Sequence, residues 1–294
     1  MKNNKMKVTL YGKSLQETCF TVIQQVIDIL ATHCSWVYVY QPFYESIKND
    51  FNFPANFRAT NSEGVEKDTD YVFSIGGDGT FLDALTLVKD SGIPMFGINI
   101  GRLGFLSSVN IHTLEQSIID IKNKNFHIEK RMLLHCEPTI GNDINWALND
   151  ISIQRNNNSG MISISVSING EFLNTYWCDG LIIATPTGST AYSLGCGGPI
   201  IMPMVDAIVL TPIASHMLTV RPLVIPADSL IEIKAASRAA THVVSLDSNS
   251  YTVNTGTTLT ISKEKFHINL ICLSHQTFSK TLREKLMWGF DKRN

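Results

Sequence analysis

Residues 71–80 read YVFSIGGDGT, an apolar run that leads directly into three glycines placed around one aspartate. The run has the composition of a buried strand, and residues 81–88 have the spacing of a helix. Glycines at the end of a strand let the backbone approach a phosphate closely, and N–H groups at a helix start favour an anion. The sequence therefore predicts a nucleotide site formed by a strand, a loop and a helix.

Asp78 is the residue of this loop that is best suited to chemistry. A carboxylate beside phosphates repels them unless it binds a metal or accepts a proton. The structural alternative is that Asp78 caps the helix beginning near Gly79, a frequent use of aspartate. A second glycine-rich loop, residues 101–106, follows the next strand, and ligands of open parallel sheets bind outside such strand ends. The two loops together favour a chemical role for Asp78.

The first third of the chain alternates between strands and helices. A strand, a capping-box pair at Ser14 and Glu17, and an amphipathic helix come first, and further strands follow. The expected strands are residues 7–11, 36–40, 71–75 and 93–98. This alternation is typical of an open, mostly parallel sheet that helices cover.

Short strands dominate from about residue 106, after one expected helix at residues 113–122. Asn169-Gly170 follows an alternating run and is a strong hairpin signal. A helical period returns near the end through Leu282, Leu286 and Phe290. The other expected strands are residues 162–168, 181–184, 230–233, 243–246, 259–261 and 268–273. We therefore predict an α/β N-terminal domain of residues 1–105 with 275–294, and a β-rich, sandwich-like domain of residues 106–274.

A third loop is the richest in hydroxyl groups. Residues 179–195 contain an apolar run, then several serines and threonines, then the aromatic ring of Tyr192. Such hydroxyls can bind ribose or phosphate, and Tyr192 can stack on a purine. They can also bond to their own backbone, as in an ordinary turn. The same two interpretations apply to Asn149 and Asp150.

Composition excludes several classes of partner. The chain has 294 residues, 24 Lys plus Arg against 26 Asp plus Glu, and a net charge of -2. This balance leaves no basic excess to hold nucleic acid or an anionic membrane. Charged residues make up only 17%, below the usual value of about 25%, which favours surface buried between subunits.

Hydropathy and cysteine spacing exclude further classes. The sequence has no apolar run of about 20 residues, so we expect no membrane span. Its six cysteines lack Cys-x-x-Cys spacing and its eight histidines include no His-x-x-x-His pair. Neither a disulfide framework nor a zinc knuckle is indicated, and the chain is expected to be cytoplasmic with reduced thiols.

Taken in order, these motifs resemble the successive signatures of NAD kinases. The similarity begins with the loop around Asp78 and continues nearly to the end of the chain. Related glycine-aspartate loops occur in diacylglycerol kinases, so the stretch at residues 185–192 is the specific part. The matching segments are residues 76–80, Asn99 with 101–106, 149–150, 179–180, 185–192, 197–199, 211–213 with His216, 221–223 and 282–288.

The resemblance implies a reaction and its accessories. The terminal phosphoryl group of ATP, or of polyphosphate in some members, is transferred to the adenosine ribose 2′-hydroxyl of NAD to give NADP. The aspartate matching Asp78 accepts the hydroxyl proton. A divalent metal ion, Mg²⁺, is expected with the nucleotide, without a predicted protein ligand. A homodimer or homotetramer is also implied.

The resemblance also implies which residues contact the nucleotide. Asp179 matches an aspartate that contacts NAD held by a neighbouring subunit. Asn249 stands where the family more often has glutamine, and Trp177 where some members have a basic residue. The implied set is Asp78, Gly79, Asn149, Asp150, Trp177, Asp179, Thr187, Thr190, Ala191, Tyr192, Ser193, Leu194, Gly195 and Asn249.

Two other functions fit parts of the same pattern. A lipid kinase of the diacylglycerol type shares the first loop, but the sequence lacks a basic or amphipathic stretch for a membrane surface. The third hypothesis is a nucleotide-sensing protein on the same scaffold that binds NAD or NADP without catalysis. Phosphorylation of NAD, phosphorylation of a lipid, and binding without transfer are the three outcomes that separate these hypotheses.

Overall fold

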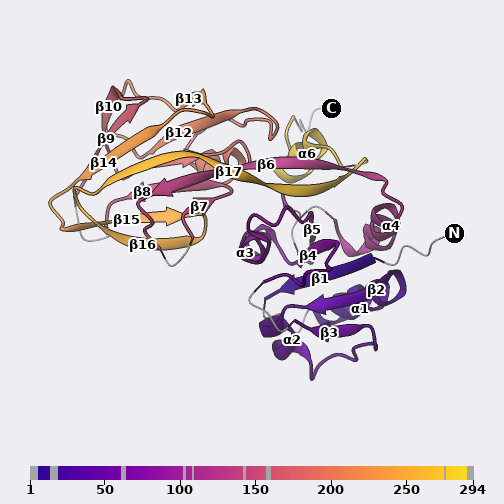
Figure 1. Ribbon diagram of the computed structural model, residues 1–294. Coiled ribbons are helices and arrows are strands. Elements are labelled where there is room, and N and C mark those ends of the chain that lie inside the picture. The colour runs from indigo at the N-terminus through magenta and orange to yellow at the C-terminus, as the bar shows by residue number, and fades with distance from the viewer. Residues whose placement is uncertain are drawn as a thin grey trace. The chain divides into compact units, whose positions relative to one another are not determined.

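The computed structural model shown in Figure 1 divides into two compact units. Unit 1 comprises Met1–Lys130 and Ile268–Asn294, and unit 2 comprises Arg131–His267. Among the described residues, no helix is long and apolar enough to cross a membrane. The residues that the structure describes are 6–13, 19–60, 64–101, 104–107, 109–141, 144–156, 160–274 and 276–289.

Unit 1 contains a parallel sheet. Its strands are β1 (Met6–Gly12), β2 (Cys34–Val39), β3 (Phe57–Ala59), β4 (Tyr71–Ile75) and β5 (Met95–Ile98). They lie in the order β5-β4-β1-β2-β3, and every neighbouring pair is parallel. The end of β17 (Thr258–Leu273) joins β5, also in parallel, through Leu270 and Met95. The predicted open parallel sheet is confirmed.

Five helices are described in unit 1. They are α1 (Phe20–His33), α2 (Gln41–Ile47), α3 (Asp78–Val88), α4 (Ile111–Lys122) and α6 (Phe278–Leu286). The apolar stripe expected for α1 is buried, because residues three and four apart share one face of a helix. The predicted capping-box residues Ser14 and Glu17, and Phe290, lie outside the described residues.

Helix α4 shows where unit 1 ends. Residues 106–130 were expected to belong to the β-rich domain. In the structure, α4 packs on α1, and its Leu114, Ile118 and Ile121 belong to the core of unit 1. Unit 1 therefore extends to Lys130, and the chain returns to it at Ile268.

Unit 2 consists of two antiparallel sheets. The first has the order β10 (Glu171–Cys178), β9 (Ile162–Ile168), β14 (Ile231–Ala236) and β17. The second sheet has the order β13 (Leu223–Pro226), β12 (Ala207–Ile213), β11 (Gly180–Ala184), β8 (Asp150–Gln154), β15 (Thr241–Leu246) and β16 (Asn249–Asn254). Alternate apolar residues of both sheets form one core, which includes Ile164 and Val166 of β9 and Ile151 and Ile153 of β8. The predicted sandwich-like domain is confirmed.

Local turn chemistry agrees with the sequence at the β9–β10 hairpin. Asn169 and Gly170 have φ values of 52° and 81°, the two positive values that a type I′ turn requires.

Strand β17 differs from the expectation of two separate strands, because it runs without a break from Thr258 to Leu273. Strands β6 (Phe126–Glu137) and β7 (Trp146–Ala147) form a further antiparallel pair.

Candidate active site

Asp78 lies in the first turn of α3, directly after the glycines that follow β4. The N-cap of this helix is Gly77, and no side chain caps it. The Asp78 carboxylate instead accepts hydrogen bonds from the N–H groups of Phe105, Leu106 and Ser107, at 2.8, 3.0 and 3.0 Å. Asp78 therefore fixes the second glycine-rich loop rather than capping its own helix.

Gly104 permits this close approach. A Cβ atom at Gly104 would lie 2.0 Å from Oδ1 of Asp78 and 2.7 Å from its Cγ. Any larger residue would force the loop and the carboxylate apart. Arg102 and Leu103, earlier in the same loop, lie outside the described residues.

Lys285 of α6 is a further partner of Asp78 that sequence reasoning missed. Its Nζ lies 3.3 Å from Oδ2 of Asp78 and 4.4 Å from the centre of the Phe105 ring. A carboxylate offers about four lone-pair positions, and the three N–H groups and the ammonium fill them. The side chains of Asp78 and Lys285 remain 28% and 31% exposed, so solvent reaches the pair.

Unit 2 contains a second carboxylate with the same backbone arrangement. Asp247, in the turn between β15 and β16, accepts hydrogen bonds from three successive N–H groups. The donors are Leu148, Asn149 and Asp150, at 2.8, 2.7 and 3.1 Å. The predicted nucleotide contacts Asn149 and Asp150 are thus held by a residue that the sequence analysis did not assign to the site.

The loop after β11 lies against the same segment. The Thr185 N–H donates to the carbonyl oxygen of Asn149 at 2.9 Å, and the Thr185 hydroxyl donates to that of Leu148 at 2.6 Å. A Cβ atom at Gly188 would lie 2.0 Å from the carbonyl oxygen of Asn149. The structure therefore brings Asn149, Asp150 and the start of the hydroxyl-rich loop together.

Most hydroxyls of this loop bond within the protein. Ser189 donates to the Pro186 carbonyl at 2.6 Å, and Thr190 donates to the Thr187 carbonyl at 3.1 Å. The Ser193 hydroxyl lies 2.8 Å from that of Thr211. The Thr187 hydroxyl accepts a bond from Arg131 at 3.4 Å. The interpretation of these hydroxyls as an internally bonded turn therefore describes much of the loop.

The outer part of the loop is more accessible. A short 3-10 turn (Gly188–Thr190) and the one-turn helix α5 (Tyr192–Gly195) follow β11. Tyr192 is 43% exposed, and Gly195 is also exposed. Ala191 and Leu194 are half-buried, whereas Ser193 is buried. The ring of Tyr192 is therefore the side chain of this loop best placed to meet a ligand.

Burial changes the titration of the two carboxyl groups near Asn149. Asp150 is 6% exposed, and burial, with the nearby charge of Asp247, raises its pKa to about 7. Burial also raises the pKa of Asp247 to about 6, although its three N–H donors favour the charged form. Near neutral pH, Asp150 can therefore either donate or accept a hydrogen bond.

The other predicted residues are Asp179, Trp177 and Asn249 in unit 2 and Gly79 in unit 1. Asp179 precedes β11, so roughly 20 Å of extended chain separates it from Thr185. The Arg155 Nε donates to Asp179 at 2.8 Å, and Trp177 is 53% exposed on β10. Asn249 is exposed at the start of β16, next to the turn that holds Asp247. In unit 1, Gly79 is exposed beside Asp78.

Comparison with known proteins identifies the family. Residues 8–126 match the ATP-NAD kinase N-terminal domain, and residues 148–273 match the ATP-NAD kinase C-terminal domain. The chain belongs to the NAD kinase family. Asp78 lies in the first matched segment, and the predicted nucleotide contacts from Asn149 to Asn249 lie in the second.

Individual NAD kinases are similar over nearly the whole length. The chain is 42% identical to the NAD kinase of Flavobacterium psychrophilum, and the match covers 98% of this chain and 100% of that protein. It is 40% identical to a Bacteroides fragilis NAD kinase, with the same coverage. The predicted family and enzyme class are confirmed.

Solved structures of NAD(H) kinases have the same fold. Yeast NADH kinase complexed with NADH superposes with a TM-score of 0.85 at 27% identity, over 99% of this chain and 90% of that chain. An NAD kinase from Archaeoglobus fulgidus in complex with ATP gives a TM-score of 0.72 at 23% identity, over 97% of this chain and 98% of that chain. The predicted NAD kinase-like fold is confirmed.

Within the described residues, no group of three His, Cys, Asp or Glu side chains offers Mg²⁺ the all-oxygen ligands that it prefers. The lone pairs of Asp78 are taken by three N–H groups and Lys285. Within the described residues, the group of His, Cys, Asp and Glu close enough to hold a metal is His127, Glu129 and Cys272. Its nitrogen and sulfur donors do not suit Mg²⁺, which prefers oxygen ligands.

Proposed function

We propose that this NAD kinase transfers the terminal phosphoryl group of ATP to the adenosine ribose 2′-hydroxyl of NAD, giving NADP and ADP. The name of the matching domains supports ATP as donor, and the yeast relative described with NADH supports a nicotinamide dinucleotide as acceptor. Polyphosphate is the alternative donor. The observation that carries the proposal is the partly exposed Asp78 carboxylate, held in a fixed orientation by the second glycine-rich loop.

Asp78 is the proposed proton acceptor. As the hydroxyl oxygen bonds to phosphorus, its O–H bond breaks, the proton passes to the carboxylate, and the bond to the leaving ADP breaks. The hydroxyl needs a lone pair of Asp78, and all four are occupied. Lys285 is the partner that can leave without disturbing the backbone, because it donates from a side chain and the other three donors are backbone N–H groups. Its bond of 3.3 Å is also the longest of the four. We therefore infer that the hydroxyl replaces Lys285 at Oδ2.

Unit 2 supplies the proposed nucleotide contacts. Asn149 and Asp150 suit ribose hydroxyls, because Asp150 can donate or accept near neutral pH. The exposed ring of Tyr192 can stack on adenine. The hydroxyls of Thr187, Thr190 and Ser193 already have protein partners, so we assign their segments a shaping role. The remaining proposed contacts are Gly79, Ala191, Leu194, Gly195 and Asn249.

Asp179 is assigned a contact with NAD held by a second copy of the chain, and Trp177 stays a proposed nucleotide contact. Asp179 lies at the far end of β11 from Thr185, which supports its contact with NAD held by a neighbouring subunit. A homodimer or homotetramer follows from this assignment. We propose that Mg²⁺ enters with the nucleotide and supplies charge neutralisation at the phosphates, which is its usual mode of binding.

A coupled assay tests the proposed reaction. Purified full-length protein is incubated with NAD, Mg²⁺ and either ATP or polyphosphate, and NADP is measured with an NADP-specific dehydrogenase. Formation of NADP with ATP supports the proposal. Binding of NAD without NADP formation supports a sensor, and phosphorylation of diacylglycerol but not NAD supports a lipid kinase.

A further inference from the structure

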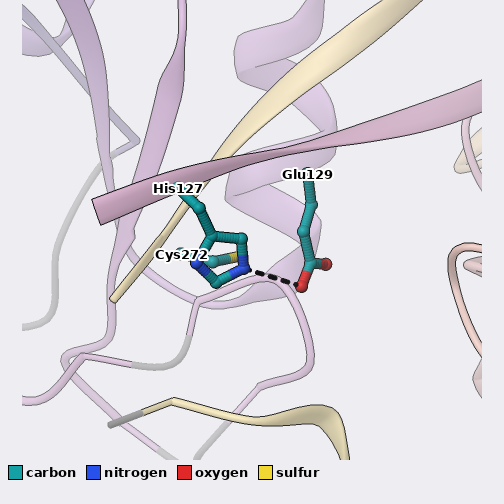
Figure 2. A group of neighbouring side chains, drawn as sticks. All are labelled: His127, Glu129 and Cys272. Atoms are coloured by element: carbon teal, nitrogen blue, oxygen red, sulfur yellow. Dashed lines mark hydrogen bonds and ion pairs between the residues drawn. The ribbon is translucent and has the colours of Figure 1, made fainter. Parts of the chain in front are cut away.

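Three side chains with different donor atoms converge in unit 1, apart from the residues assigned to catalysis. His127 and Glu129 lie on β6, and Cys272 lies on β17, which pairs with β6. One ligand atom from each lies within 4.8 Å of the others, and Nε2 of His127 is 3.4 Å from Oε1 of Glu129. Figure 2 shows the thiol beside the imidazole ring and the carboxylate reaching toward the ring nitrogen.

Strand periodicity explains why these residues meet. His127 and Glu129 are two residues apart on one strand, so they share a face. Ile271 and Leu273 belong to the core of unit 1, so Cys272 between them points to the opposite face of β17. The thiol therefore does not contribute to the core. The His127 side chain is 57% exposed, which leaves a path for an ion from solvent.

We propose that His127, Glu129 and Cys272 form a binding site for Zn²⁺. Imidazole nitrogen, thiolate sulfur and carboxylate oxygen are the three usual zinc ligands, with bonds of about 2.0–2.3 Å. Two ligands of a tetrahedral zinc ion then lie about 3.3–3.8 Å apart. The nitrogen of His127 and the oxygen of Glu129 are already 3.4 Å apart, and the sulfur of Cys272 lies within 4.8 Å of both.

The donor set also separates zinc from other cations. Magnesium and calcium select oxygen ligands, and neither accepts a thiolate readily. Three protein ligands leave the fourth position of a tetrahedral ion for water. Because the ligands come from β6 and β17, the bound ion links two strands that are remote in sequence. This also explains why no zinc-knuckle spacing is present in the sequence.

Cobalt substitution and zinc titration test the site in the full-length protein. Co²⁺ bound to a thiolate gives a charge-transfer band in the near ultraviolet. We expect one equivalent of Zn²⁺ per chain to displace the Co²⁺ and abolish this band. Loss of a residue that only hydrogen-bonds to a metal ligand already lowers metal affinity by about tenfold or more. Loss of a ligand itself should lower it further, so Cys272→Ser and His127→Ala should each weaken Zn²⁺ binding at least about tenfold. Cys19→Ser changes another half-buried thiol of unit 1, and His112→Ala changes an exposed imidazole; both are matched controls and should bind Zn²⁺ as the parent does.

Thiol protection gives an answer that depends on no variant. Zn²⁺ should slow alkylation of Cys272 in the unmodified protein without slowing that of Cys19, as measured by peptide mass spectrometry. The proposal is overturned if Co²⁺ gives no thiolate band, if Cys272→Ser leaves that band unchanged, or if Cys272 alkylates equally fast with and without Zn²⁺. None of these measurements depends on NAD phosphorylation.

Discussion

Replacing Asp78 by asparagine separates its proposed chemical role from its structural one. In the parent, the N–H groups of Leu106 and Ser107 donate to Oδ1, and the amide oxygen of the variant can still accept both of these bonds. The amide NH₂ replaces Oδ2 and faces two donors, the Phe105 N–H and the Lys285 ammonium. The variant therefore loses both the proton acceptor and part of the loop's support.

Loss of loop support changes the free energy of unfolding, whereas loss of the proposed proton acceptor changes kcat. One backbone N–H without an acceptor lowers the free energy of unfolding by about 1–3 kcal/mol. A domain that is stable by about 5–15 kcal/mol remains folded after such a loss. Loss of a general base lowers kcat by about 10²–10⁴-fold. We expect Asp78→Asn to show both effects, measured by urea unfolding and by NADP formation at saturating ATP and NAD.

Asp247→Asn is the matched control, because Asp247 holds three successive N–H groups in the same way. Its unfolding free energy should fall by a similar amount. Its KM for NAD should rise, because Asn149 and Asp150 lose their support, whereas kcat should fall far less than in Asp78→Asn. If Asp78→Asn keeps kcat within about tenfold of the parent, Asp78 is not the base and its role is structural.

Three further predictions concern Lys285, Asp150 and Gly104. Lys285→Met should keep kcat within about tenfold, and it should change the unfolding free energy by less than about 1 kcal/mol, because the ion pair is exposed; a loss of kcat as large as in Asp78→Asn would contradict replacement of Lys285 by the hydroxyl. The pKa of Asp150 is raised from 3.8 to about 7, so its contribution to stability is present below the lower value and is lost as pH rises through the higher one. Asp150→Asn should therefore reduce the fall in urea midpoint across that interval, and an unchanged pH dependence would be inconsistent with a buried, titrating Asp150. Gly104→Ala should lower both kcat and stability, because its Cβ would lie 2.0 Å from Asp78, whereas Gly101→Ala in the same loop meets nothing within 4 Å and should behave as the parent.

Local patterns predicted much of the fold. The apolar run before the glycines is β4, with the expected bounds, and the Asn169-Gly170 pair forms the expected hairpin turn. Helix α2, which follows the strand expected at residues 36–40 and contains Pro42 in its first turn, was not among the expected elements. Proline is also tolerated in the first turn of a helix, where its missing N–H has no partner to lose. One residue type thus fits two local structures, and packing of Phe43 and Ile47 into the core selects the helix.

The contacts that organise the site could not be read from the sequence in the same way. Lys285 and Asp78 are separated by 207 residues, and Asp247 lies 97 to 99 residues from the N–H groups that it binds. Such pairs leave no spacing pattern, because only the completed fold brings them together. Cys272 is likewise remote in sequence from His127 and Glu129, the other two proposed Zn²⁺ ligands.

Asp78 and Asp247 show that backbone geometry alone does not assign a chemical role. Each carboxylate accepts three successive N–H groups, an arrangement that fixes a loop equally well in both places. The two carboxylates differ in burial and in their further partners. Burial raises the pKa of Asp247, whereas Asp78 has a fourth partner, the ammonium of Lys285, that is itself partly exposed. A partner that solvent can reach is one that a substrate hydroxyl can replace. Access to one lone pair is therefore the property that supports Asp78, rather than Asp247, as the proposed proton acceptor.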